Sequence, residues 1–249
     1  MNASGFLGLG FVLIFFMLML FFTATARKGG KYSLREIPAF AKLRRGIGLA
    51  VEAGQRLHIS LGHGGVSGLQ GASALLGLSM LQRIARAASV SDRPPVATSG
   101  EATQAVLSQD TLRSVYHAIG ADNQFEAKLG QLTGLTPFSF AAGALPIVFD
   151  WQVSVNILAG HFGSEVALIT DAAERTGGLT LAGSDSIPAQ AVLYVAAQEP
   201  LIGEELYAGG AYIQAGPMHL ASVRVQDVLR WVLAAIILAG AALKLVGAL

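Results

Sequence analysis

The chain has 249 residues, 53% of them hydrophobic and only 13% charged, and its formal net charge is +1. An average soluble domain carries roughly 25% charged residues, so part of this chain is expected to lie outside water. The absence of cysteine excludes disulfides, thiolate catalysis and cysteine-ligated metals.

The first 26 residues predict an N-terminal transmembrane helix. They contain no charged side chain, and the run from Phe6 to Phe22 is almost wholly apolar. About 20 such residues cross a hydrocarbon core of ~30 Å. The alternative is a cleaved signal peptide, because Ala24–Ala26 resembles a cleavage site. A signal peptide carries its charges before the apolar run, whereas the cations here follow it, at Arg27, Lys28 and Lys31, and an anchor is therefore favoured.

Residues 27–230 predict one α/β domain, in which short β-rich runs alternate with helical patterns after an exit segment at 27–33. We expect strands at residues 57–61, 95–99, 129–133, 153–158 and 179–182. We expect helices at residues 39–53, 67–88, 101–119, 137–150, 163–176, 188–197 and 202–212. This alternation is typical of βαβ units. The predicted fold is α/β and Rossmann-like, with a mostly parallel sheet, helices on both faces and a transmembrane helix at each end. Five strands are too few for a closed (β/α)₈ barrel.

Residues 231–249 predict a second transmembrane helix. Lys244 is their only charge, and a lysine near a helix end reaches the headgroups. Arg230 and Trp231 suit the membrane interface. A buried core helix or a helix lying in the membrane plane is the alternative, but the segment lacks the polar face that an in-plane helix needs.

The basic residues indicate an orientation for the domain between the two spans. Eight of the seventeen Lys and Arg residues fall between Arg27 and Arg56, directly after the first span. In a bacterial-type plasma membrane, the positive-inside rule then places residues 27–230 in the cytoplasm and both termini outside. Because the membrane flank explains this cluster and no aromatic residues interleave it, no nucleic-acid partner is predicted.

Small and polar residues gather after the predicted strands, where open parallel sheets bind their ligands. The helix N-termini that follow offer free N–H groups to an anion. The candidate binding residues, for a nucleotide or another small anion, are Gly62, His63, Gly64, Gly65, Ser67, Ser99, Asn156, Gly160, Gly163, Gly183 and Ser184. The alternative is that they only form turns and helix caps, because the first loop lacks the GxGxxG spacing and no Walker-type GK[ST] occurs.

The sequence patterns for metal binding and catalysis are weaker than the pattern for ligand binding at the strand ends. His63 and His161 are able to meet at the strand ends, but no further ligand follows at a recognisable spacing, so no metal site is predicted. Ser184, His161 and Asp185 form a possible hydrolytic set, but no GxSxG surrounds any serine, so no catalytic residue is assigned. The sequence indicates no particular cofactor.

Glu204, Glu205 and Tyr207 form a separate candidate site. Paired carboxylates among apolar residues suit an interface with a basic segment or a solvated helix face, whereas an acid–base pair would need an opposing carboxylate elsewhere. An interface is favoured over catalysis.

Several motifs resemble a prokaryotic family of membrane-anchored α/β domains, known only as a domain of unknown function. The most specific are NILAGHFGSE (Asn156–Glu165) and LIGEELYAGGAY (Leu201–Tyr212), and the others are REIPA from Arg35, HISLGHGG from His58, LAGS from Leu181 and QD at Gln226. The resemblance covers roughly residues 34–240. It implies an α/β domain that ends in a transmembrane helix, and it brings no activity, cofactor or catalytic residue. It also implies that the position of His161 varies and is often Ser, which argues against a metal or catalytic role for it.

Two functions follow from these features. We expect a subunit of a homo-oligomeric membrane assembly or scaffold, because two spans cannot enclose a pore alone and Gly240 and Ala241 lie among small residues that let helices approach closely. The alternative is a membrane-tethered sensory domain for a small anion or nucleotide, and an enzyme is least supported. The expected partners are the lipid bilayer, further copies of the chain and, in the alternative, a small anionic ligand.

Overall fold

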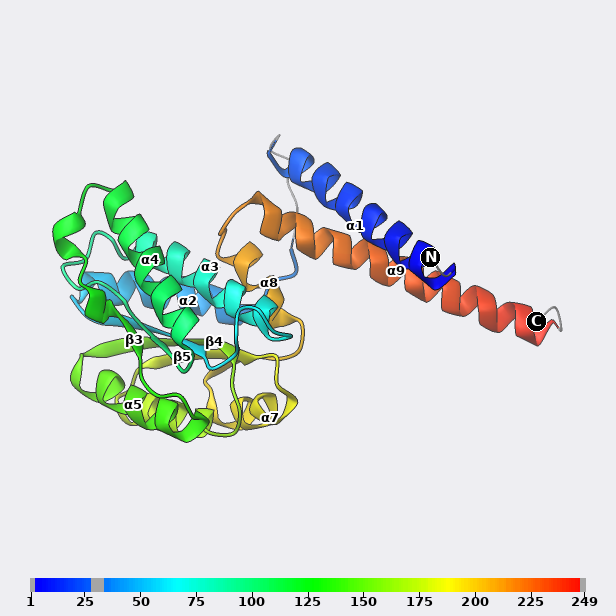
Figure 1. The fold of residues 1–249 in the computed structure, drawn as a ribbon. Helices are drawn as coiled ribbons and strands as arrows, with labels where there is room; N and C mark the ends of the chain where they lie inside the picture. The colour runs from blue at the N-terminus through cyan, green and yellow to red at the C-terminus, as the bar shows by residue number, and fades with distance from the viewer. Residues whose placement is uncertain (1–2, 28–33, 247–249) are drawn as a thin grey trace. The chain divides into compact units, whose positions relative to one another are not determined.

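A six-stranded sheet forms the centre of residues 35–215 in this computed structural model, which describes residues 3–27 and 34–246 (Figure 1). The strands are β1 (Arg56–Gly62), β2 (Val96–Ser99), β3 (Gly130–Leu132), β4 (Val153–His161), β5 (Leu179–Ser184) and β6 (Glu199–Leu201). Their order is β3-β2-β1-β4-β5-β6, and every neighbouring pair is parallel. This is the strand order of the Rossmann fold, so the predicted α/β, Rossmann-like architecture is confirmed.

Helices cover both faces of the sheet (Figure 1). One face carries α2 (Pro38–Glu52), α3 (Gly71–Ala87), α4 (Ala102–Ala118) and α8 (Glu205–Tyr212), and the other carries α5 (Pro137–Asp150), α6 (Val166–Arg175) and α7 (Ile187–Ala196). Two short 3₁₀ helices, Asp122–Gln124 and Ala127–Leu129, precede β3.

The strand residues alternate between two buried cores. Leu57 and Ile59 of β1 pack with α2, α3 and α4, whereas Leu158 of β4 and Ala182 of β5 pack with α5, α6 and α7. Successive strand side chains point to opposite faces, and a sheet covered twice therefore reads as a nearly continuous apolar run.

The sixth strand was not predicted from the sequence, which indicated five. β6 contains only Glu199, Pro200 and Leu201 and pairs with β5 alone. Proline lacks the N–H that an interior strand would need, but an edge strand tolerates it. The segment therefore has neither the length nor the composition by which strands are recognised.

The helix predicted to begin near Ser67 begins at Gly71 instead. The intervening residues form consecutive turns, in which Gly68 N–H donates to Gly65 O and Gly71 N–H donates to Gly68 O. The glycines that suggested a ligand loop thus extend the β1–α3 connection.

The terminal segments form a second unit, made of α1 (Ala3–Arg27) and α9 (Pro217–Leu245). Within the described residues, these two helices are long and apolar enough to cross a membrane. α9 begins at Pro217, well before the start predicted near Trp231, and proline at the first turn suits a helix start. The predicted exit at residues 28–33 and the last residues of the predicted second span, 247–249, lie outside the described residues.

Candidate functional site

The chain reverses its direction of winding between β1 and β4. From β1 it passes through α3 to β2 on one side, and from β4 it passes through α6 to β5 on the other. Gly62 pairs with His161 where the two strands end. In Rossmann-like sheets this switch point, at the carboxyl edge, is where ligands bind.

His63 leaves β1 at this edge and bonds to a buried carboxylate. Its Nε2 lies 3.0 Å from Oε1 of Glu165, a residue that is only 2% exposed. The same oxygen accepts the N–H of Gly163 at 2.7 Å. Because the carboxylate is an acceptor, it places the ring proton of a neutral His63 on Nε2 and leaves Nδ1 unprotonated.

His161, the last residue of β4, forms a second pair of this kind. Its Nδ1 lies 2.6 Å from Oδ1 of Asp185, and the hydroxyl of Ser73 donates to the other oxygen of Asp185 at 2.7 Å. A neutral His161 therefore carries its proton on Nδ1 and leaves Nε2 unprotonated.

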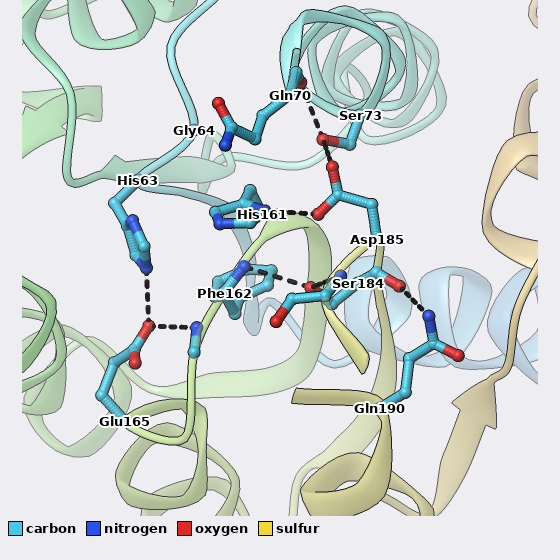
Figure 2. Close-up of polar contacts among 12 residues, drawn as sticks. His63, Gly64, Gln70, Ser73, His161, Phe162, Glu165, Ser184, Asp185 and Gln190 are labelled. Atoms are coloured by element: carbon cyan, nitrogen blue, oxygen red, sulfur yellow. Dashed lines mark hydrogen bonds and ion pairs between the residues drawn. The ribbon is translucent and has the colours of Figure 1, made fainter. Parts of the chain in front are cut away.

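The two imidazoles are neighbours. Their ring centroids lie 5.2 Å apart and their planes are nearly perpendicular, at 84°. Figure 2 shows the rings next to each other, each bonded to its own carboxylate. Side-chain exposures of 20% for His63 and 25% for His161 leave both rings partly open to solvent.

The electrostatics of this edge are set by the carboxylates. Burial, together with the negative charge of Asp185, raises the pKa of Tyr207 above its usual value. Tyr207, predicted as an interface residue, is therefore affected by the same carboxylate that bonds to His161. Among the described residues, no three His, Cys, Asp or Glu side chains are grouped so that they could hold a metal ion.

The possible Ser–His–Asp set does not assemble around Ser184. Ser184 is fully buried, and its Oγ accepts the backbone N–H of Phe162 at 3.1 Å and of Ser186 at 3.2 Å. The serine that joins the pair is Ser73, and it bonds to the carboxylate rather than to the imidazole. A nucleophile has to contact the ring nitrogen, so this arrangement is not a hydrolytic triad.

Most of the candidate glycines are required by close packing. A Cβ at Gly64 would lie 2.7 Å from Cβ of His161 and 2.8 Å from Cβ of Gln70. Gly62, at φ +74°, and Gly160 likewise face backbone of the adjacent strand, and Gly163 and Gly183 face neighbouring side chains. Gly65 differs, because no described atom lies within 4 Å of its Cβ position.

The remaining predicted residues lie in different surroundings. Ser67 is exposed in the β1–α3 loop, and Ser99 is buried with its hydroxyl donating to the carbonyls of Glu101 and Gln131. Glu205 pairs with Arg35 at 2.5 Å within the same unit.

Asn156 lies inside the sheet, away from the strand ends. Its Oδ1 is 3.0 Å from Nδ1 of His58, whose Nε2 is 2.9 Å from the hydroxyl of Thr98. All three are fully buried. Burial lowers the pKa of His58 to about 4, and the hydrogen bond to Asn156 offsets this only in part.

The sequence pointed to both histidines of this edge but not to the side chains that bond to them. Glu165 and Asp185 stand at predicted strand ends but were not included among the binding residues, and Ser73 and His58 were not singled out. Glu165 lies 102 residues from His63, so no local spacing joins them. The signal within reach was that Glu165 and Asp185 follow predicted strands, because the carboxyl ends of parallel strands meet at one edge.

Comparison with protein families identifies the chain. The family model described as Domain of unknown function (DUF6754) matches residues 2–249. The chain belongs to this family. The resemblance to a domain of unknown function, inferred from the motifs, is thereby confirmed. Comparison with curated proteins and with solved structures found no match. Membership in the family carries no activity, so function has to be argued from the site.

Proposed function

We propose that this chain is a membrane-tethered domain that binds a small polar molecule beside His63 and His161. The observation that carries the proposal is the pair of neighbouring imidazoles, each fixed by its own carboxylate. In the neutral rings, His63 Nδ1 and His161 Nε2 are hydrogen-bond acceptors at the switch point of the sheet. Two acceptors on adjacent rings suit a ligand that donates hydrogen bonds, such as an amine or a polyol.

The charge balance favours a neutral or cationic ligand. Two carboxylates, Glu165 and Asp185, lie directly behind the two imidazoles and are the acidic groups bonded to them. The N–H of Gly163, just before α6, already bonds to Glu165 and is not available to an anion. The small anion or nucleotide expected from the sequence would face these carboxylates, and it is the competing ligand class in the test.

The test is nitrogen NMR of the histidine rings in the full chain, reconstituted in nanodiscs and titrated with polyols, amines, nucleotides and inorganic phosphate. A ligand of the proposed class is expected to shift the ring signals of His63 and His161 and to leave those of His117 unchanged. His117 is a matched control, because it also lies 3.0 Å from a carboxylate, Asp122, but is 79% exposed. If only nucleotides or phosphate shift the signals, the site binds an anion and the proposed ligand class is wrong. No shift with any compound would refute a binding site here.

A second proposal is that the chain assembles into homo-oligomers through α9. At Gly240, no described atom lies within 4 Å of the Cβ position, so packing against α1 does not use this glycine. Small residues at helix surfaces allow close approach of another membrane helix. We expect Gly240→Leu to reduce the mass of the assembly in nanodiscs and Gly10→Leu, on the equally open side of α1, to leave it unchanged. A monomeric wild-type chain would refute this proposal.

The membrane orientation is also a proposal. The support is the basic segment after α1, which favours the α/β unit in the cytoplasm and both termini outside. Val90→Cys introduces a single cysteine on an 82% exposed position. This cysteine should react with a membrane-impermeant maleimide only after the cells are permeabilised. Labelling of intact cells would show that the α/β unit lies outside.

A further inference from the structure

The outward face of α5 and α7 is unusually apolar for a layer that faces solvent. α7 contains no charged residue, and α5 contains only Asp150, its last residue. Large apolar side chains are nevertheless exposed on both helices and just before α5. They are Leu135 (73% exposed, just before α5), Phe138 (65%), Phe149 (46%), Ile187 (80%), Tyr194 (71%) and Val195 (85%).

These residues form stripes rather than scattered positions. On α5, Phe138 and Phe149 share one side, while Phe140, Ala144 and Val148 are buried beneath the helix. On α7, Ile187, Tyr194 and Val195 lie opposite the buried Ala189 and Leu193. α6 packs against both helices and adds Leu168, 41% exposed. We call these seven apolar residues, with the three helices that carry them, the α5–α7 face.

The opposite layer shows what a solvated face of this unit looks like. Its exposed residues include many charges, among them Lys42, Arg45, Glu52, Asp110 and Arg113. Both layers pack on the same sheet and bury a core beneath them. The opposite layer also exposes apolar side chains, such as Leu49 and Val106, but charges lie among them, whereas an extended exposed apolar surface is typical of an interaction site.

The size of the α5–α7 face suits a stable dimer. Seven large side chains with full areas of roughly 150–200 Å² each, exposed at the fractions above, leave on the order of 800 Å² of apolar surface. One partner contributes about 800 Å² to a standard protein–protein interface.

The charges decide between a bilayer and another copy of the chain. The exposed charges of α6 are Asp171, Glu174 and Arg175, and Arg175 is paired with Asp171 at 2.7 Å. Helices that lie on a bilayer carry Lys and Arg beside their apolar face, because the lipid surface is negative. This face has the opposite balance. A two-fold interface, in contrast, places the same apolar patch against itself and needs no complementary charge.

We propose that the α5–α7 face is the surface through which two copies of this chain associate. The proposal is independent of the ligand site and of packing between membrane helices. Confinement of both copies to one membrane would raise their effective concentration and favour the contact.

The test is the mass of the full chain in nanodiscs, measured for Val195→Glu and for Val106→Glu. Val106 is a matched control, because it is 64% exposed on α4 of the opposite layer. We expect wild type and Val106→Glu to be dimers or even-numbered oligomers, and Val195→Glu to have half their mass. A monomeric wild type, or a Val195→Glu variant that keeps the wild-type mass, would overturn the proposal. An oligomeric wild type that Val195→Glu does not dissociate would exclude the α5–α7 face and leave the proposed contact through α9 untouched.

A second measurement maps the contact directly, without introducing a charge into it as Val195→Glu does. The native chain has no cysteine, so single-cysteine variants report contacts without background. Cysteines placed one at a time at Phe138, Leu168 and Tyr194 are expected to give a cross-linked dimer with a short bis-maleimide in native membranes for at least one position, and Val106→Cys is expected to give none. Cross-linking that is equal at Val106, or absent at all three face positions, would contradict the proposed surface.

Discussion

His58 should make this fold less stable in acid. Its ring is fully buried between β2 and β4, with Asn156 Oδ1 at 3.0 Å from Nδ1 and Thr98 Oγ1 at 2.9 Å from Nε2. The tautomer with the proton on Nδ1 donates to Asn156 and places Nε2 against the threonine hydroxyl, so each nitrogen of a neutral ring has a polar neighbour. A second proton would place an unpaired charge in the sheet.

The size of the effect follows from the two pKa values. Burial lowers the pKa of folded His58 to about 4, whereas an unfolded histidine titrates near 6.5. Between these values the unfolded chain binds the proton more tightly, so stability is full above about pH 6.5 and falls as the pH drops toward 4. At 1.36 kcal/mol per pKa unit, the loss amounts to about 2 kcal/mol at pH 5 and about 3 kcal/mol once the pH is below 4.

The assay is the pH dependence of unfolding in detergent, compared between wild type and His58→Gln from pH 7.5 to 5. Other groups titrate as well, so the informative quantity is the difference in slope. The variant should be less stable at pH 7.5 but should lose about 2 kcal/mol less on acidification. His117→Gln, at an exposed position, should keep the wild-type slope. Equal slopes for wild type and His58→Gln would show that His58 does not contribute to the acid sensitivity. If the variant does not fold, titration of the wild-type ring by NMR decides, because His58 should stay neutral down to pH 5.

Three further substitutions test the packing of the carboxyl edge and its surroundings. Gly64→Ala should lower the melting temperature, because its Cβ would lie under 3 Å from His161 and Gln70, whereas Gly65→Ala should leave it nearly unchanged. Equal melting temperatures for the two variants would contradict the assigned packing. Glu165→Gln should cost about 1–3 kcal/mol in urea unfolding, because the amide retains an oxygen for Gly163 but loses the charge-assisted bond to His63, and an unchanged unfolding midpoint would argue against that bond. Arg35→Ala should change the free energy of unfolding by less than about 1 kcal/mol, because solvent screens the pair with Glu205, and a larger loss would show that this pair is more than a surface contact.

The fold class was predictable because the strands carry a strong local signal. Segments such as VSVNIL are β-branched, apolar and bounded by turns, and their alternation with helices requires a parallel sheet. The strand order was not encoded in that spacing. It depends on which face each connecting helix covers, and this is decided by packing between residues far apart in the chain. β6 was missed because three residues that include a proline resemble a loop.

The candidate site was predictable in position but not in detail. The histidines and most of the glycines named from the sequence lie together at one edge of the sheet, since carboxyl ends of parallel strands meet there. Their roles could not be inferred, because each depends on a partner on another element. Gly64 is small to admit His161 and Gln70, and His63 is oriented by Glu165. Asn156 was named as a ligand residue because no sequence pattern indicates that its side chain bonds to His58 inside the sheet.

Thermal unfolding of the full chain with a panel of compounds measures whether His63 and His161 share a ligand site. At a concentration of 100 times Kd, a ligand stabilises the folded state by about 2.7 kcal/mol, which is readily visible as a shift in melting temperature. We expect a neutral or cationic hydrogen-bond donor to raise the melting temperature of the wild type and of His117→Asn, but not that of the His63→Asn/His161→Asn double variant. Stabilisation that persists in the double variant, or none from any compound, would contradict it.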